Sequence, residues 1–493
     1  MRKSGILLPI AGLPAKYGIG TFGKEAYRFV DQLKEAGQTY WQILPLGATG
    51  YGDSPYQSFS TFAGNPYYID LEMLVEEGLL KEEDIEPFDF GDNEHYIDYE
   101  KIYKSRFKVL RMAYENCNLE YNGSFWEFVG DNKFWLEDYA LFMAVKNAFD
   151  GKSFAEWDDD IRLRKPEAMQ HYKNLYADEI NFYRFQQFFF MKQWKKLKQY
   201  ANENGIEIIG DIPIYVAFDS ADTWSDPKLF QVDENCMPVA VAGCPPDAFS
   251  DLGQLWGNPL YDWEYHAKTG YEWWTKRMFH CRKLYDVVRV DHFRGFDSYY
   301  AIPFGKEDAK EGVWEKGPGM DLFDTLRRVL GETKIIAEDL GFLTPSVLEL
   351  VRQSGFPGMK VLQFAFDPRE PNDYLPHNYQ NNCVVYTGTH DNDTLLGWLK
   401  ELPEEDREYA KEYMGISSDR DEEIAEGVIR LAMGSVAKVC IVPIQDYLGK
   451  DGSARTNKPA TLGDNWKWRM SADDLTDEVV KKIHRMTWMY SRL

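Results

Sequence analysis

Short apolar segments rich in β-branched residues recur along the whole chain. Eight of them are typical of buried parallel strands, namely 5–9, 40–44, 206–211, 287–291, 334–338, 358–364, 384–386 and 438–443. Each but the last is followed by a predicted helix, either directly or after an insertion. This alternation predicts an α/β fold, a closed (β/α)8 TIM barrel. A doubly wound sheet is the alternative, although no GxGxxG motif follows the first strand.

Two long segments interrupt this alternation. Residues 65–178 carry acidic and aromatic helical patterns, which predict a helical insertion subdomain after the second strand. Residues 215–263 are rich in Pro, Gly and Asp, which predicts an irregular, loop-rich insertion after the third strand, over the mouth of the barrel. We expect residues 1–493 to form one barrel domain without a C-terminal β-domain, because the last helical pattern lies at 476–488.

Charge and composition narrow the class of protein. The net charge of −24 disfavours partners with phosphate backbones and anionic membrane surfaces, so we expect no nucleic-acid and no membrane role. No apolar run approaches the roughly 20 residues of a membrane span. The six cysteines lie far apart and form no CxxC pair, which favours reduced thiols in a cytoplasmic protein over disulfides or a zinc site.

Charged side chains stand where several predicted strands end. Asp211, Asp291 and Glu338 end the third, fourth and fifth strands, and His390-Asp391 follow the seventh. In a parallel barrel these ends face the same side, so the sequence predicts a ring of carboxylates around one cavity. A single acid in such a place would most simply pair with an arginine, but its recurrence at several strand ends favours a functional site.

Two kinds of chemistry use a ring of carboxylates. One is the binding of Mg²⁺ or Ca²⁺ by oxygen ligands, and the other is glycosyl transfer between a nucleophilic carboxylate and a protonated one about 5–5.5 Å away. Strand alternation places Arg289 on the same face as Asp291. We expect this fixed cation to lower the pKa of Asp291 and to oppose a bound metal. Aromatic residues, 15% of the chain, also suit sugar stacking, so we prefer the glycosidase-type site.

Several motifs resemble those of one known family. Residues 289–295, 337–341 and 388–392 resemble the three catalytic blocks of the 4-alpha-glucanotransferases, and further matches lie at 52–57, 210–215, 245–250, 254–259 and 375–379. These enzymes, also called amylomaltases or disproportionating enzymes, form glycoside hydrolase family 77 and are related to the α-amylases. The resemblance extends from the first strand to the Asn465-Trp466 region, which is nearly the whole chain.

The resemblance implies a role for each matched residue. Asp291 would be the nucleophile, Glu338 the general acid and then the base, and Asp391 the third carboxylate, which holds hydroxyls of the donor sugar. The implied substrate-binding residues are Tyr56, Asp211, Trp256, Asn258, Arg289 and His390. Neither a cofactor nor a metal is expected. Asp251 and Leu252 depart from the usual Ser-Glu-Thr-Gly-Gln loop of the family, so contacts to the acceptor glucan are expected to differ.

The implied activity is the retaining transfer of an α-1,4-glucan segment to the 4-hydroxyl of an acceptor glucan or glucose. Maltooligosaccharides, starch or glycogen-type glucans are the expected substrates. Two alternatives stay open at this point: hydrolysis of the α-amylase type, and a catalytically silent glucan-binding protein. The complete set of three carboxylates disfavours the silent binder, because binding alone does not need a matched nucleophile and acid.

Overall fold

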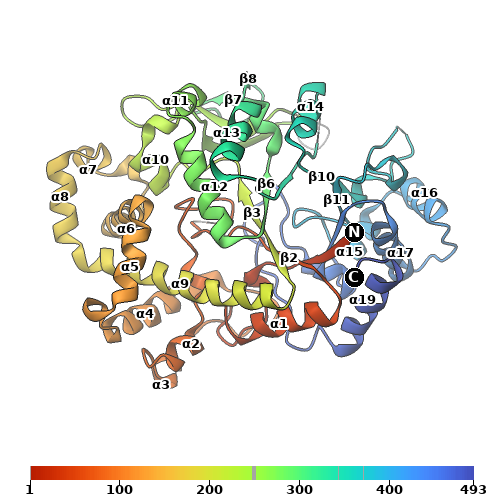
Figure 1. Cartoon of the computed structure of the whole chain (residues 1–493), viewed down its shortest axis with the longest axis horizontal. Coiled ribbons are helices and arrows are strands. Elements are labelled where there is room, and N and C mark those ends of the chain that lie inside the picture. Colours follow the sequence, from red (N-terminus) through yellow and green to blue (C-terminus); the bar gives the residue numbers. More distant parts are fainter. Residues whose placement is uncertain (1, 51, 247–250, 342, 370) are drawn as a thin grey trace.

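The fold centres on a closed barrel of eight parallel strands (Figure 1). A computed structural model of the protein describes residues 2–50, 52–246, 251–341, 343–369 and 371–493. Around the barrel the strands are ordered β1-β2-β3-β6-β9-β10-β11-β12. Their bounds are β1 Lys3–Leu7, β2 Tyr40–Gln42, β3 Glu207–Pro213, β6 Val287–Asp291, β9 Ile335–Ala337, β10 Gly358–Val361, β11 Cys383–Tyr386 and β12 Val439–Pro443. Each strand overlaps one of the eight predicted segments. The prediction of a TIM barrel is confirmed.

Alternation along β6 decides which side chains face the barrel interior. Val287 belongs to a buried cluster drawn from seven of the barrel strands, whereas Val288 and Val290 pack into the larger core that includes the helices. Because side chains alternate between the two faces of a strand, Arg289 and Asp291 share the face of Val287. The apolar interior therefore gives way to charge at the carboxyl end of β6.

Helices follow most barrel strands and cover their outer face. They include α1 Lys24–Glu35 after β1, α9 Ala177–Glu203 before β3, α12 Glu272–Leu284 before β6, α13 Met320–Leu330 before β9 and α14 Pro345–Ser354 after β9. In α1, residues Ala26, Phe29, Val30 and Leu33 form the buried stripe that the sequence pattern indicates. Thr344 caps α14 by accepting a hydrogen bond from the backbone N–H of Val347.

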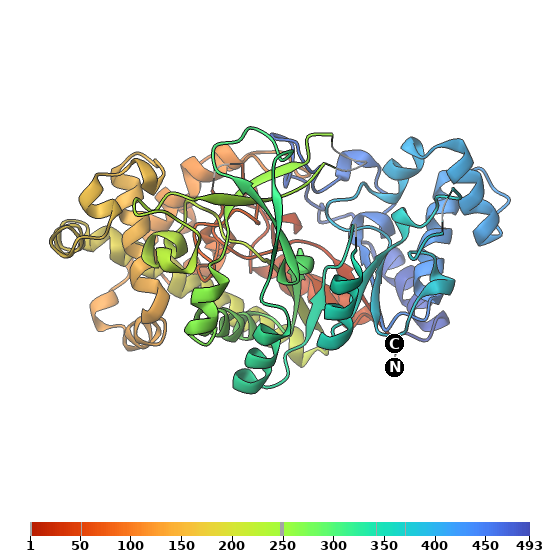
Figure 2. The ribbon, with the colours of Figure 1, turned by 90° about the horizontal axis from the view of Figure 1, so that it is seen from above.

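Two groups of helices extend the molecule on opposite sides of the barrel (Figures 1 and 2). Between β2 and β3 lie α2 Leu71–Glu76, α3 Glu82–Ile85, α4 Tyr99–Asn116, α5 Gly123–Asp131, α6 Lys133–Ala148, α7 Asp159–Arg162 and α8 Pro166–Leu175. From β11 onward lie α15 Leu395–Glu401, α16 Glu404–Met414, α17 Asp421–Gly434, α18 Ile444–Tyr447 and α19 Asp477–Met489.

A second sheet stands beside the barrel, and the sequence analysis did not predict it. Its antiparallel strands are ordered β5-β4-β7-β8, with bounds β4 Ala240–Cys244, β5 Gln254–Pro259, β7 Ser298–Pro303 and β8 Val313–Lys316. The prediction that 215–263 is irregular is therefore wrong for β4 and β5. This segment also contains α10 Ala221–Ser225, and α11 Trp263–Lys268 begins where it ends. β4 was missed because its partner β7 lies roughly 60 residues further along the chain, where no local pattern marks the pairing, and β5 pairs only with β4.

A predicted helix is also missing between β10 and β11. The described part of this connection contains only the short 3₁₀ helices Leu362–Phe364 and Pro376–Asn378. Three prolines, Pro368, Pro371 and Pro376, lie in it. Because proline lacks a backbone N–H and clashes with the preceding turn, it prevents a regular helix here.

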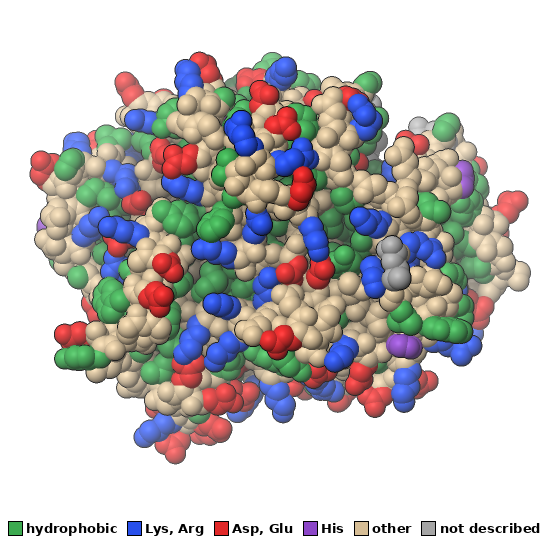
Figure 3. Space-filling model, viewed as in Figure 1, with side chains coloured by type: hydrophobic (Ala, Val, Ile, Leu, Met, Phe, Trp, Pro, Cys, Tyr) green, Lys and Arg blue, Asp and Glu red, His purple; other side chains and the backbone are tan. Residues whose placement is uncertain are grey.

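The two ends of the chain lie side by side (Figure 2). β1 pairs in parallel with β12, and the buried Arg492 side chain donates from Nη1 to the Lys3 carbonyl at 2.8 Å. Figure 3 shows a face on which acidic and basic side chains are interspersed. Within the described residues, none of the helices combines the length and the apolar character that crossing a membrane requires.

Candidate active site

Arg289 joins two carboxylates at the carboxyl ends of β3 and β6. Its Nη1 lies 2.8 and 2.7 Å from the two carboxylate oxygens of Asp211 and 2.9 Å from Oδ1 of Asp291. The strand register explains this contact, because Asp211 pairs with Arg289 across β3 and β6. Asp211 is fully buried and only 3% of the Arg289 side chain is exposed, so little water screens this ion pair.

Glu338 follows β9, and two backbone N–H groups hold its carboxylate. The N–H of His292 donates to Oε2 at 2.7 Å, and that of Leu340 donates to Oε1 at 2.8 Å. His292 has φ 53°, in the left-handed region that non-glycine residues rarely adopt. This backbone conformation turns the chain directly after Asp291. The His292 N–H then joins the end of β6 to Glu338, at the end of β9.

Burial raises the pKa values of both central acids. Burial, followed by the negative charge of Asp291, raises the pKa of Glu338 to about 7. Burial also raises the pKa of Asp291, and the Arg289 charge only partly offsets this effect. The expectation that Arg289 sets the direction of the Asp291 shift is therefore wrong, because desolvation is the larger effect.

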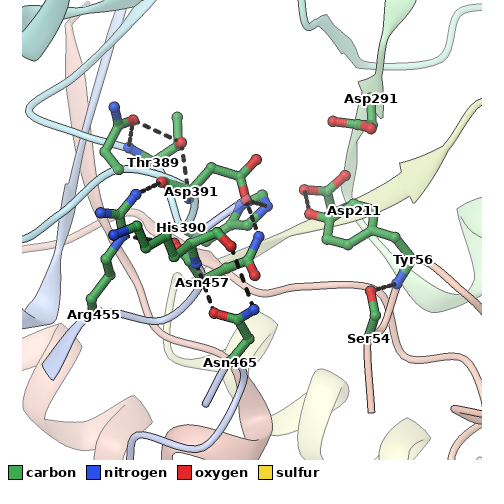
Figure 4. Close-up of polar contacts among 12 residues, drawn as sticks. Ser54, Tyr56, Asp211, Asp291, Thr389, His390, Asp391, Arg455, Asn457 and Asn465 are labelled. Carbon is green, nitrogen blue, oxygen red and sulfur yellow. Dashed lines mark hydrogen bonds and ion pairs between the residues drawn. The ribbon is translucent and has the colours of Figure 1, made fainter. Parts of the chain in front are cut away.

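His390 and Asp391 lie on the loop after β11 (Figure 4). His390 Nε2 lies 3.3 Å from Asp391 Oδ1, and Asn457 Nδ2 donates to the same oxygen at 2.6 Å. Arg455 Nη2 donates to the Asp391 backbone carbonyl at 2.6 Å. The Asp391 charge contributes to the raised pKa of Asp291, as does that of Asp211, so the structure brings these three carboxylates into one electrostatic site.

Tyr56 connects the two parts of this site. Its hydroxyl donates to Asp211 Oδ2 at 2.9 Å, and its ring stacks on that of His390 with centroids 5.2 Å apart and planes 17° apart. The ring of Trp466 packs against both of these rings, with its centroid 5.9 Å from that of Tyr56 and from that of His390. The Tyr56 hydroxyl is therefore satisfied within the protein, and one face of the ring is covered by His390.

Trp256 and Asn258, both on β5, lie beside the site in different ways. The Trp256 ring meets the His292 ring edge-on, with centroids 4.8 Å apart. Asn258 is buried, donates to the Val216 carbonyl at 2.7 Å and accepts from Gln57 at 3.4 Å. Trp256 thus contacts the residue after Asp291, whereas Asn258 mainly fixes neighbouring backbone. The adjoining motif at 245–250 lies partly outside the described residues, since 247–250 are not among them.

Two residues that hold the Asp391 loop were not predicted from the sequence. Asn457 and Arg455 lie beyond β12, just after the 3₁₀ helix Gly452–Ala454, in a segment for which no strand or helix was predicted. The only available signal was topological, since the segment after the eighth strand starts at the same end of the barrel as the other strand ends. Among the residues that the structure describes, no three His, Cys, Asp or Glu side chains gather in an arrangement that could hold a metal.

Comparison with known proteins now adds to this geometry. A glycoside hydrolase family 77 model, described as 4-alpha-glucanotransferase, matches residues 8–476. The chain belongs to the 4-alpha-glucanotransferase family. This confirms the resemblance seen in the motifs, and the protein is an enzyme of the transferase class.

Individual members of the family are similar over their whole length. The 4-alpha-glucanotransferase of Clostridium butyricum is 52% identical over 98% of this chain and 99% of its own. That of Streptococcus pneumoniae is 50% identical over 100% and 98%. The structure of an amylomaltase from Streptococcus agalactiae in complex with acarbose superposes with a TM-score of 0.97 at 42% identity and covers both chains completely.

Proposed function

We propose that this 4-alpha-glucanotransferase family member transfers an α-1,4-glucan segment with retention of configuration, through a covalent glycosyl-enzyme on Asp291. The observation that carries the mechanism is that Asp291 and Glu338 lie in different electrostatic surroundings. Asp291 lies against the Arg289 cation, whereas the charge of Asp291 helps to raise the pKa of Glu338 to about 7. With Asp291 ionised, Glu338 therefore keeps a proton near neutral pH.

The first half of the reaction breaks the donor bond. An oxygen of Asp291 attacks the anomeric carbon as the bond to the leaving oxygen breaks, and Glu338 gives its proton to that oxygen. The shortened glucan or glucose leaves with the proton. In the second half, the 4-hydroxyl of the acceptor attacks the same carbon, Glu338 takes its proton, and the Asp291 carboxylate is released.

The remaining residues act on the donor sugar and on the nucleophile. Asp391 accepts hydrogen bonds from donor hydroxyls, and these bonds strengthen as the ring approaches an oxocarbenium ion. Its side chain is 43% exposed, so its oxygens are available to a ligand. Arg289 holds Asp291 in line for attack. Tyr56 and His390 form the wall on which the donor rests, and the fully buried Asp211 holds the Tyr56 hydroxyl from behind.

Transfer also requires that the glycosyl-enzyme meets an acceptor before water. We propose that residues 215–263 form a lid over the site and that residues 65–178 form a helical subdomain of the single barrel domain. The edge contact between Trp256 and His292 supports the lid, because it joins β5 to the residue after the nucleophile. Such a lid excludes water while the acceptor enters.

The proposed substrates are maltooligosaccharides and starch or glycogen-type α-1,4-glucans. The Streptococcus agalactiae amylomaltase in complex with acarbose supports this class, since it matches the chain over its full length. The proposal includes no cofactor.

Incubation with maltotriose tests the function. Transfer predicts free glucose together with a ladder of longer oligomers, and the first products keep the α-configuration by NMR. Asp291→Asn should abolish the ladder. Maltose and glucose without longer products would indicate hydrolysis and overturn the transfer proposal, and unchanged turnover in Asp291→Asn would overturn the mechanism.

A further inference from the structure

Both ends of the loop that carries His390 and Asp391 are tied to one buried carboxylate outside the site. Asp446, on α18, accepts from Thr387 Oγ1 at 2.7 Å through Oδ2 and from the backbone N–H of Leu395 at 2.8 Å through Oδ1. Thr387 is the first residue after β11, and Leu395 is the first residue of α15. The seven residues between them, 388–394, form the β11–α15 loop.

We propose that Asp446 is a positioning residue that fixes the β11–α15 loop, and with it Asp391, in the geometry needed for glucan transfer. This inference rests on the proposed function, because it assigns Asp446 to the support of a group that the mechanism uses. Asp446 itself does not touch the substrate. It is only 7% exposed, and both of its oxygens are occupied by donors of the loop ends.

Several other residues contact the loop. The Asn457 backbone N–H donates to the His390 carbonyl at 3.1 Å, and its Nδ2 donates to Asp391 Oδ1. Gln363 Nε2 donates to the Asp393 carbonyl at 2.7 Å, and Arg455 holds the Asp391 carbonyl. These contacts hold the interior of the loop, whereas Asp446 fixes the distance between its two ends. At Gly388 an added Cβ would lie 2.6 Å from Gln363 Nε2, so this end of the loop runs close to its neighbours.

The pKa of Asp446 indicates that its negative charge does not stabilise the fold, which favours a positioning role. Burial, which outweighs the two hydrogen bonds, and the neighbouring Asp393 charge raise the pKa of Asp446 to about 6. A carboxyl whose pKa is higher in the folded state than in the unfolded state makes folding less favourable as pH rises through that interval. At neutral pH the Asp446 charge therefore opposes folding, although its hydrogen bonds order the loop.

The chain contains a matched control. Asp70, also 7% exposed, accepts from Thr21 Oγ1 at 2.6 Å and from the backbone N–H of Met73 at 2.9 Å, at the start of α2. The two carboxylates thus make the same pair of bonds, to a threonine hydroxyl and to the first turn of a helix. Only Asp446 ties the loop that carries Asp391.

The experiment compares kcat and KM for maltotriose transfer and urea unfolding in Asp446→Ala, Asp446→Asn, Asp70→Ala and Asp70→Asn. Urea unfolding gives the stability change of each alanine variant, and only Asp446→Ala should lower kcat, on the order of 10²-fold, with a smaller change in KM. Asp446→Asn should recover most of this loss. Its carbonyl still accepts from Leu395, and its amide donates to Thr387, whose hydroxyl serves as either donor or acceptor.

Two further results decide the outcome. Should Asp446→Ala fail to fold, Thr387→Val removes one of the two bonds at nearly constant volume and should lower kcat by a smaller factor. Equal kcat in the Asp446 and Asp70 alanine variants, or in Thr387→Val and wild type, would overturn the inference. Failure of the wild type to form the oligomer ladder would instead overturn the proposed function, so the two failures are distinguishable.

Discussion

The active site has two parts that are held by different means. On the strand side, Arg289 and Asp291 end β6, and buried charge pairs and backbone N–H groups fix the acids. On the loop side, Asp391 is held by the amide of Asn457 and the guanidinium of Arg455, and 43% of its side chain is exposed. The first part depends on buried ion pairs, whereas the second depends on hydrogen bonds from distant segments of the chain. Mutations should therefore act mainly on chemistry and stability in the first part and on donor positioning in the second.

The largest effect is expected for Glu338→Gln, which removes the proton donor of the strand side without changing the size of the side chain. Steady-state kinetics with maltotriose should show a loss in kcat of about 10²–10⁴-fold. Glu332→Gln, which changes an exposed acid paired with Arg327, should leave kcat unchanged. A loss in kcat of Glu338→Gln no larger than that of this control would remove Glu338 from the mechanism.

Arg289→Met tests whether the strand side is held by charge. The variant leaves Asp211 and Asp291 without their shared cation, so urea unfolding at neutral pH should show a stability loss of about 3–5 kcal/mol. The loss should shrink in acid, where the carboxyls are protonated. Arg289→Lys should recover part of the stability. Equal losses at both pH values would mean that Arg289 acts through packing alone.

Asn457→Ala tests the loop side. It removes the 2.6 Å hydrogen bond to Asp391, and a bond of this kind to a charged group is worth about 1.5–3 kcal/mol. We expect kcat/KM for maltotriose to fall by the factor that corresponds to this free energy, while the free energy of unfolding changes little. Asn465→Ala is the matched control, since Asn465 accepts from the Lys458 N–H in the same connection and has no hydrogen bond to Asp391 among those found. Similar kinetics in the two variants would contradict the division into two parts.

The smallest effect is a pH dependence set by Glu338. Because its pKa is raised to about 7, kcat/KM should fall as pH rises through about 7 and the acid loses its proton. The folded state also binds this proton more tightly than the unfolded state, so wild-type stability should decrease between the unfolded pKa and about 7. Glu338→Gln should lose this part of the stability profile. A flat kcat/KM profile above neutral pH would contradict the assignment.

The same division explains what could be predicted from the sequence. The eight barrel strands were recognisable because parallel buried strands are continuous apolar runs, and the acids that end them at Asp211, Asp291 and Glu338 interrupt those runs visibly. Barrel topology then brings these ends together without further information. The catalytic blocks of the family resemblance point to the same positions.

Other features depend on contacts that no local pattern records. The pKa of Asp291 was predicted in the wrong direction because burial depends on the packed site, whereas the sequence shows only the neighbouring Arg289. Asn457 contacts Asp391 from a segment 66 residues further along the chain, for which no strand or helix was predicted. The second sheet pairs β4 and β5, from between β3 and β6, with β7 and β8, from between β6 and β9, so its register is set by tertiary packing.

The most direct test of the account is to trap the glycosyl-enzyme. A maltosyl fluoride donor does not need a proton at its leaving group, so Glu338→Gln should form the intermediate and resolve it slowly, because the base is missing. Mass spectrometry of the intact variant should show one added maltosyl unit, and peptide mapping should place it on Asp291. Turnover without any adduct, or an adduct on another residue, would contradict the central claim.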